Sequence, residues 1–264
     1  MKSYVIAEIA TTWEMDRSRM LALMYAVKDA GCKAVKTQWT SDPARMALRR
    51  RMPNDAYNYL KWPAEWHPQF ADEARRLNMD YLCTVYLSED LSAIAPYVAR
   101  FKIASLEAGD GVLRRAHAAY KQPVLISTGV MEHEEVLALR RECLADGLMD
   151  ATLLLTSSCY PCGHEEVNLN AIRSGCYGGF SDHTHDLTMG GAAVVAMGRP
   201  GVIEVHVRDA STRVDNPDFL HSLLPQELTQ YVREIQLKER ALGSATRVVT
   251  DGEKPLRFHR VVRP

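Results

Sequence analysis

The sequence predicts an α/β protein built as a (β/α)8 TIM barrel, and three observations support this fold. Short apolar runs alternate with helical patterns eight times along the chain. The apolar runs are nearly continuous, as in parallel strands that are buried on both faces. The length of 264 residues suits a single barrel, which commonly reaches about 250 residues. An open doubly wound sheet is the alternative, but no G-x-G-x-x-G follows the first run to indicate a dinucleotide site.

The order of the elements follows from these patterns. We expect strands at residues 4–10, 33–38, 80–86, 100–105, 123–128, 151–157, 176–182 and 202–207. Helical spacing of apolar residues is clearest at 18–31, 134–147, 187–198 and 225–243. The helix at 187–198 is rich in Gly and Ala, which predicts close packing against the sheet. The connection 39–63 is too long for a turn, so we expect a lid or an excursion on the barrel rim.

Composition and charge restrict the partners. Lys and Arg number 32 against 33 Asp and Glu, a net charge of −1, so nothing favours nucleic acid or an anionic membrane surface. No apolar run reaches the length of a membrane span, and the first residues do not resemble a signal peptide. We therefore expect a cytoplasmic protein, with one barrel domain over residues 1–246 and a C-terminal tail over 247–264.

The six cysteines are expected to be free thiols in such a chain. Cys159 and Cys162 form a C-x-x-C pair, a spacing found in metal and redox sites. No second pair follows at zinc-ribbon spacing, so a metal or redox role is the less favoured interpretation.

Polar side chains gather where the expected strands end, which is where barrel enzymes carry their catalytic groups. Taken singly, each could have an ordinary structural role. Glu8 could be a satisfied core carboxylate, and Lys36 and Lys102 could extend their ammonium groups out of the barrel. Burying the whole set without a ligand would cost on the order of several kcal/mol. The set comprises Glu8, Lys36, Gln38, Thr84, Lys102, Ser105, Glu107, Ser158, Tyr160, Ser181, Asp182, His183, Glu204 and His206.

The residue types in this set indicate two kinds of chemistry. Lysines together with hydroxyl groups suit a phosphate. A single histidine on an apolar strand is more often a hydrogen-bonded core residue than a ligand. His183 and His206, however, follow neighbouring strands, so their imidazoles could share one divalent metal and leave positions open for water and substrate.

Seven stretches of the sequence, all within residues 4–222, resemble the sialic acid synthases, which include N-acetylneuraminate synthase and its legionaminate and pseudaminate relatives. They are VIAEIA, AVKTQ, FKIASLE, PVLISTG, LLLTSSCYP, GGFSDHT and VIEVHV, of which SDHT and IExH are the most specific. The resemblance implies a barrel domain that condenses phosphoenolpyruvate (PEP) with an N-acylated amino-sugar aldehyde. Phosphate and a 2-keto sugar acid are the implied products. The implied cofactor is a divalent metal, typically Mn²⁺, with Mg²⁺ or Co²⁺ as alternatives.

The resemblance also implies individual roles. His183 and His206 match the metal-binding histidines, and Glu8 matches a catalytic acid or base. Lys36 and Lys102 match lysines at the PEP carboxylate and phosphate. Of these, Glu8 and Lys36 are the predicted catalytic residues, together with Glu107, which matches an active-site acid. The resemblance implies contacts to PEP for Thr84, Ser105, Ser181 and Ser158, and contacts to the sugar for Gln38, Tyr160 and Asp218. Ser158 stands at a position where the family commonly has Asn.

The sequence departs from the family pattern after the first strand. The family usually has the pattern E-I-G-x-N-H-x-G-D here, whereas this sequence has EIATTWEMD. Thr12 and Trp13 therefore replace the Asn-His pair, and Met15 replaces a glycine. These changes leave the identity of the acceptor aldehyde open.

A second departure concerns the C-terminal antifreeze-like domain of the family, which is expected to be absent. Arg257, Arg260 or Arg263 could replace the arginine that this domain contributes, although a solvated basic tail is the favoured interpretation.

Three functions follow, in order of preference. The first is a metal-dependent transferase that joins PEP to an aldehyde sugar, with a homodimer compatible with the resemblance. The second is a non-catalytic barrel that binds a sugar or regulates a partner, which the joint presence of Glu8, Lys36, His183 and His206 disfavours. The third is a metal-dependent keto-acid lyase that acts without PEP. Lys102 and Ser105 disfavour it, because a lysine and a hydroxyl group suit a phosphate.

Overall fold

The computed structural model describes residues 2–261 and forms a closed barrel of eight parallel strands, as the sequence predicts. Each strand pairs with its neighbours in chain order, and the last strand closes onto the first, from Tyr4 opposite Val202 to Glu8 opposite His206. The strands are β1 (Tyr4–Glu8), β2 (Ala34–Trp39), β3 (Asp80–Val85), β4 (Arg100–Ile103), β5 (Val124–Ser127), β6 (Ala151–Leu155), β7 (Gly179–Asp182) and β8 (Val202–His206).

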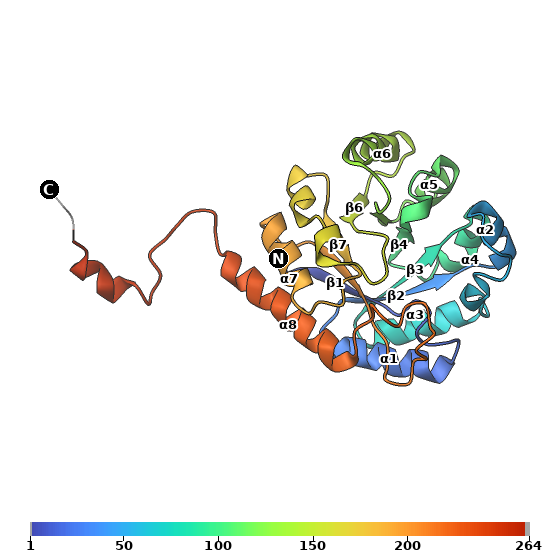
Figure 1. Cartoon of the computed structure of the whole chain (residues 1–264), viewed down its shortest axis with the longest axis horizontal. Helices are drawn as coiled ribbons and strands as arrows, with labels where there is room; N and C mark the ends of the chain where they lie inside the picture. Colours follow the sequence, from blue (N-terminus) through green and yellow to red (C-terminus); the bar gives the residue numbers. More distant parts are fainter. Residues whose placement is uncertain (1, 262–264) are drawn as a thin grey trace.

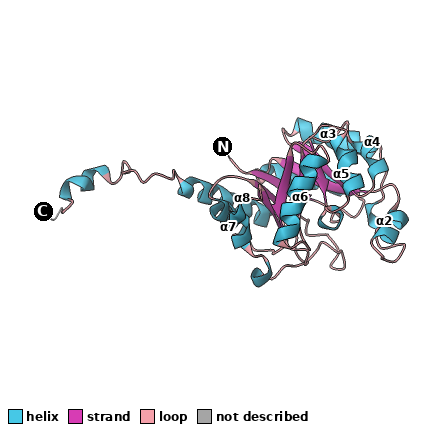
Figure 2. Cartoon of the chain, turned by 90° about the horizontal axis from the view of Figure 1, so that it is seen from above, coloured by secondary structure: helices cyan, strands magenta, loops and turns pink. Residues whose placement is uncertain are grey.

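Helices surround the barrel in the order in which they follow the strands (Figures 1 and 2). Local sequence sets their ends. Asp16 and Asp110 accept hydrogen bonds from first-turn amides, and Gly31 and Gly147 take φ of 90° and 89° just beyond two helices. The helices are α1 (Arg17–Asp29), α2 (Pro43–Arg49), α3 (Trp66–Arg76), α4 (Leu91–Ile94), α5 (Gly111–Ala118), α6 (His133–Ala145), α7 (Met189–Met197) and α8 (Pro225–Leu242).

Side chains inside the barrel change from apolar to polar along the strands. Because successive residues of a strand face opposite sides, Ile6 and Glu8 of β1 both point inward, and so do Ala34 and Lys36 of β2. The amino-terminal layer is an apolar cluster of Ile6, Ala34, Leu82, Leu125 and Leu154. This layer closes the barrel floor, so any ligand must enter from the carboxyl-terminal mouth.

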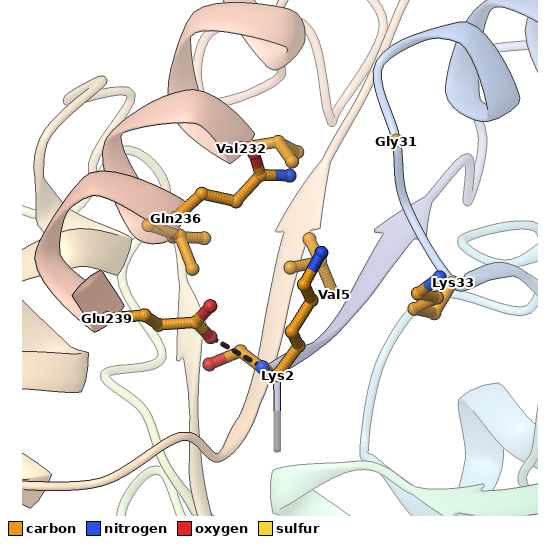
Figure 3. A pocket seen from close by; sticks show the side chains of 9 residues that line it. Lys2, Val5, Gly31, Lys33, Val232, Gln236 and Glu239 are labelled. Atoms are coloured by element: carbon orange, nitrogen blue, oxygen red, sulfur yellow. Dashed lines mark hydrogen bonds between the residues drawn. The ribbon is translucent and has the colours of Figure 1, made fainter.

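At the amino-terminal end, a small pocket lies between α8 and the start of β1. Figure 3 shows Gln236 and Glu239 of α8 facing the first residues of the chain, and the Glu239 carboxylate accepts a hydrogen bond from the Ser3 backbone amide. This contact ties the last helix to the first strand. It lies opposite the barrel mouth, at the end of a barrel that serves stability.

Helix α7 packs more closely on a neighbouring helix than the sequence predicts. A Cβ atom added at Gly190 would lie 2.5 Å from the Tyr231 ring of α8, and one at Gly191 would lie 3.0 Å from Lys238. Tyr231 is buried, and its hydroxyl donates to the Asp182 carboxylate at 2.7 Å. The small residues of α7 therefore allow α8 to approach the barrel, in addition to packing on the sheet.

The segment after α8 extends away from the barrel in both views (Figures 1 and 2). Residues 243–261 are exposed apart from the half-buried Glu253, and they include a short 3-10 helix, Lys254–His259. Arg257 and Arg260 lie in this segment, far from the mouth of their own barrel, and Arg263 lies outside the described residues. Within residues 2–261, no helix is both long and apolar enough to cross a membrane.

We predict that Gly190→Ala destabilises the protein, because the added methyl group has no space beside Tyr231. Overpacking of this kind typically costs about 1–3 kcal/mol. Urea unfolding should therefore show a lower midpoint for this variant. Gly109→Ala is the matched control, since nothing lies within 4 Å of its added Cβ. Equal midpoints for the two variants would show that the α7–α8 contact is not tightly packed.

Candidate active site

The barrel mouth contains a polar cavity with two adjoining parts. The inner pocket measures about 50 Å³ and is lined by the ends of the strands. The outer chamber measures about 500 Å³ and shares Gln38, Ser105, Tyr160 and His206 with it. Every residue of the polar set predicted from the sequence lines one of the two parts, except Glu107 and Asp182, whose carboxylate accepts from Tyr231. The inner pocket has Glu8, Lys36, Gln38, Thr84, Lys102, Ser105, Tyr160, Ser181, His183 and His206, and the outer chamber adds Ser158 and Asp218.

Glu204 is the centre of the inner pocket, although the sequence assigned it no role. One of its oxygens accepts hydrogen bonds from Lys102 Nζ and Ser181 Oγ, both at 2.9 Å. Its other oxygen lies 3.7 Å from Lys36 Nζ. Lys36 also forms an ion pair with Glu8 and donates to Thr84 Oγ1 at 3.0 Å. A usable signal existed in the sequence, because Glu204 and His206 are two residues apart and therefore share one face of β8.

Burial and neighbouring charges shift the pKa values of Lys36 and Glu204. Burial lowers the pKa of Lys36 to about 7, and the nearby Lys102 ammonium contributes, against the attraction of Glu204. Burial opposes ionisation of Glu204, but the two lysines outweigh it and hold the pKa of its carboxyl below the usual value. The pocket therefore contains a carboxylate between two lysines, one of which can gain or lose a proton near neutral pH.

Hydroxyl groups from β5 and from the loops after β4 and β6 line the cavity: Ser127 the inner pocket, Ser158 the outer chamber and Ser105 both. Ser105 Oγ accepts from the Gly129 amide at 3.1 Å. A Cβ at Gly129 would lie 2.1 Å from Ser158 Oγ, so only glycine lets both serines approach this backbone. The buried Ser127 and Ser158 hydroxyls have no hydrogen-bond partner within the described chain. Such groups are free to bind a ligand.

Beside the lysines lies a group of potential metal ligands, which we call the histidine cluster: His206, Asp218 and His221. One ligand atom from each lies within 4.8 Å of the others. Asp218 Oδ1 is 3.4 Å from His221 Nε2 and 3.7 Å from His206 Nδ1. His206 Nδ1 and both His221 nitrogens are buried without a hydrogen-bond partner in residues 2–261. Two imidazoles and one carboxylate suit a divalent transition metal.

The protonation states of the cluster also suit a metal. Burial lowers the pKa of His206, and the neighbouring His221 contributes, so the imidazole is neutral and can donate a lone pair. Burial opposes ionisation of Asp218, but His221 and His206 outweigh it and lower the pKa of its carboxyl. His221 was missed by the sequence reasoning, because it lies in the loop after β8 and outside any strand pattern.

His183, the other predicted metal ligand, lies next to the cluster. Its ring centroid is 5.4 Å from that of His206 and 5.7 Å from that of His221. Its Nδ1 is bound to the Ser157 carbonyl at 2.8 Å, and burial lowers its pKa to about 4. The Tyr160 ring covers it at a centroid distance of 4.3 Å. The fold therefore brings the predicted pair together, but Asp218 and His221 make the tighter group with His206.

The connection 39–63 forms one wall of the outer chamber and is a rim excursion, as predicted. It contains α2 and a 3-10 helix, Asn58–Leu60. Arg50 of this segment lines the chamber and holds the Glu107 carboxylate with two hydrogen bonds, of 2.8 and 2.5 Å. Glu107 lines neither part of the cavity. The structure therefore makes it the partner of Arg50, a residue that the sequence reasoning did not select.

The residues that replace the Asn-His pair serve packing. The Thr12 hydroxyl contacts the Ile9 and Val207 carbonyls, both at 2.7 Å, and so ties together the loops after β1 and β8. Trp13 is buried and packs edge-on against an aromatic group of Trp62, Trp66 and Phe70. Neither residue lines the cavity. The loop after β1 thus contributes stability at a position where the family pattern has polar residues.

Comparisons with known proteins agree with the fold. A family model described as the NeuB family matches residues 23–247. N,N'-diacetyllegionaminic acid synthase from Legionella pneumophila is 29% identical over 97% of this chain and 78% of its own length. Pseudaminic acid synthase from Campylobacter jejuni is 28% identical over 92% of this chain and 75% of its own length.

Among solved structures, a sialic acid synthetase from Leptospira borgpetersenii superimposes with a TM-score of 0.88, covering 98% of this chain and 92% of its own. Its sequence is 20% identical, so the likeness shows the fold alone. A spore coat polysaccharide biosynthesis protein from Bacillus subtilis is 25% identical with a TM-score of 0.76, over 97% of this chain and 77% of its own.

We predict that His221→Ala and His206→Ala each weaken Mn²⁺ binding by at least about tenfold, since even the loss of an outer partner of a ligand costs that much. Calorimetric titration of the metal-free protein with MnCl₂ measures the effect. His185→Ala is the control, because His185 is exposed and lies outside the cluster. If His183→Ala abolished binding while His221→Ala left it intact, the pair of His183 and His206 would be the ligand set instead.

Proposed function

The chain belongs to the NeuB family, and we propose that it condenses PEP with the aldehyde of an N-acylated amino sugar or a related aldose. The products are a 2-keto sugar acid and inorganic phosphate. The observation that carries this proposal is the buried group of Lys36, Lys102, Ser181 and Glu204, beside the histidine cluster. The synthase names of the relatives from Legionella pneumophila and Campylobacter jejuni support it.

The two parts of the cavity suit the two substrates. The inner pocket offers two ammonium groups and several hydroxyl groups, which suit the carboxylate and phosphate of a small anion such as PEP. The outer chamber is about ten times larger and is lined by Gln38, Arg50, Tyr160 and Asp218. Such a mixture of amide, cationic, phenolic and acidic groups suits the hydroxyl groups of a sugar.

A divalent metal is the proposed cofactor, with Mn²⁺ favoured and Co²⁺ or Mg²⁺ as alternatives. His206, His221 and Asp218 would hold it, with His183 beside them. Their unpartnered buried nitrogens, within residues 2–261, fit this role. Two imidazoles favour Mn²⁺ or Co²⁺ over Mg²⁺, which prefers oxygen ligands. When bound, the ion would polarise the aldehyde oxygen and lower the pKa of a water molecule.

The reaction needs charge stabilisation at two places. C3 of PEP donates its π electrons to the aldehyde carbon, and the aldehyde oxygen takes a proton to become a hydroxyl group. C2 becomes cationic, and the buried carboxylates of Glu8 and Glu204 are available to stabilise it. Water adds to C2, and collapse of the adduct breaks the bond to phosphate and leaves the 2-keto group.

The protons that the added water releases equal those that the new hydroxyl group and the phosphate take up. Of the two protons of the added water, one replaces the proton that the new hydroxyl group consumed and the other leaves with the phosphate. Lys36, with a pKa of about 7, can hold or release a proton at Nζ. Lys102, bound to Glu204, supplies positive charge for the departing phosphate. Glu8, paired with Lys36, can exchange a proton with it.

We predict that the purified protein releases phosphate from PEP only when Mn²⁺ and a suitable aldehyde are both present. A panel of N-acetylated amino sugars and aldoses identifies the acceptor, and mass spectrometry should find one 2-keto acid per phosphate. Addition of EDTA should stop the reaction. A folded protein that releases no phosphate with any acceptor would support the non-catalytic barrel instead, and cleavage of a keto acid without PEP would support the lyase.

A second prediction concerns pH. Because the pKa of Lys36 is lowered to about 7, its positive charge is nearly complete only well below pH 7 and is lost as the pH rises through 7. The Kd of PEP should therefore increase between pH 7 and 9, with a slope approaching tenfold per pH unit, the limit for a single proton. Calorimetry on the protein without acceptor measures this.

Two matched lysine variants distinguish the source of this pH dependence. Lys36→Met should bind PEP weakly, with a Kd that no longer changes between pH 7 and 9. Lys102→Met should also bind weakly but should keep the dependence, with a midpoint at higher pH because Lys102 lowers the pKa of Lys36. An unchanged slope in Lys36→Met would show that another group titrates.

A further inference from the structure

The loop after β6 carries a second group of metal-ligating side chains, which we call the cysteine cluster: Cys159, Cys162 and Glu166. One ligand atom from each lies within 4.8 Å of the others. We propose that this cluster binds a thiophilic divalent cation of the Zn²⁺ type, and that the bound ion holds the loop that carries Tyr160. The proposal is independent of the proposed function, because it concerns different ligands and a different class of metal.

The fold supplies the ligand that the sequence reasoning did not find. A second cysteine pair would normally complete a C-x-x-C zinc site, and its absence disfavoured a metal here. In the structure, Glu166 lies beside the two thiols and adds a carboxylate, which is a common zinc ligand. Two thiolates and one carboxylate leave the fourth position of a tetrahedral ion for a water molecule.

Hydrogen bonds within the loop and one bond to the residue after β7 position the ligands of the cysteine cluster. The Cys162 amide donates to the His183 carbonyl at 2.8 Å, directly after β7. Ser157 Oγ donates to the Glu166 carbonyl at 2.6 Å. The Gly163 amide donates to the Glu166 carboxylate at 3.0 Å. These bonds fix both ends of the loop and the direction of the carboxylate, so little further ordering is needed for a cation to bind.

The burial of the three ligands and their charge also suit a cation. Cys162 is buried, Cys159 is half-buried and Glu166 is exposed, so an ion can enter from solvent. A divalent cation would displace the thiol protons and neutralise the Glu166 carboxylate that lies beside them.

The position of the cysteine cluster links it to the cavity. Tyr160 lies between the two cysteines in the chain and lines both the inner pocket and the outer chamber. Its ring centroid is 4.3 Å from that of His183 and 5.0 Å from that of His221. An ion held by Cys159 and Cys162 therefore restrains the backbone on both sides of Tyr160. The ion acts as a structural clamp that positions this ring.

Cobalt titration of the full chain tests the site, since thiolate ligands give Co²⁺ a charge-transfer band in the near ultraviolet and imidazole ligands do not. The protein is kept metal-free and reduced. We expect Co²⁺ to produce the band, with an amplitude at saturation that corresponds to one thiolate-bound ion per chain, and Zn²⁺ to displace it. Cys159→Ser and Cys162→Ser should lose the band, and Glu166→Gln should weaken binding by about tenfold or more.

Two control variants show whether the band comes from the cysteine cluster. Cys176→Ser makes the same chemical change at a buried thiol outside the cluster and should keep the band. His221→Ala should also keep it, so failure of the proposed histidine site would not affect the result. A folded wild-type protein without the band, or a Cys159→Ser/Cys162→Ser double variant that retains it, would overturn the proposal.

Hydrogen exchange tests the clamp itself. Zn²⁺ should slow amide exchange in residues 157–168 of the wild-type protein and leave the double variant unchanged. Zinc binding through the thiols without slower exchange in this loop would overturn the inference that the ion positions Tyr160.

Discussion

The ion pairs around Glu204 are the interaction on which the barrel mouth depends. Its carboxylate is bound by Lys102 and Ser181 and lies 3.7 Å from the Lys36 ammonium group. Removing one partner from such a buried group typically costs about 3–5 kcal/mol, whereas replacing the whole group with apolar side chains is often neutral. One layer below, the same barrel is filled by apolar side chains. Stability alone therefore does not account for the charges, which is consistent with the proposed binding of an anionic substrate.

The closed sheet brings these charges together from distant parts of the chain. Lys102 and Glu204 are 102 residues apart, and they meet because parallel strands in register present their carboxyl ends at one mouth. The apolar floor beneath them excludes water from below and lowers the local dielectric constant. Both effects strengthen the electrostatic interactions with whatever enters from above.

The loops that follow the strands contribute the remaining side chains around the cavity. The excursion after β2 brings Arg50 over the outer chamber. The loop after β8 brings Asp218 and His221 to His206. The loop after β6 places Tyr160 against His183 and carries the two cysteines. By contrast, the loop after β1 uses Trp13 for packing against other aromatic side chains and away from the cavity wall.

The sequence by itself determined the barrel, the order of its eight strands and most residues of the cavity. It could do so because apolar runs and the two-residue period of strands are local properties, and Lys36 or Ser181 can be located from its own strand alone. Tertiary structure alone decided the partners. Glu204 contacts two lysines on other strands, Glu107 is bound by Arg50, and His221 lies with His206. These contacts join distant parts of the chain, and loop side chains such as Arg50 and His221 follow no period that a sequence pattern could show. For the same reason, the C-x-x-C pair gained Glu166 as a neighbour only once the loop was folded.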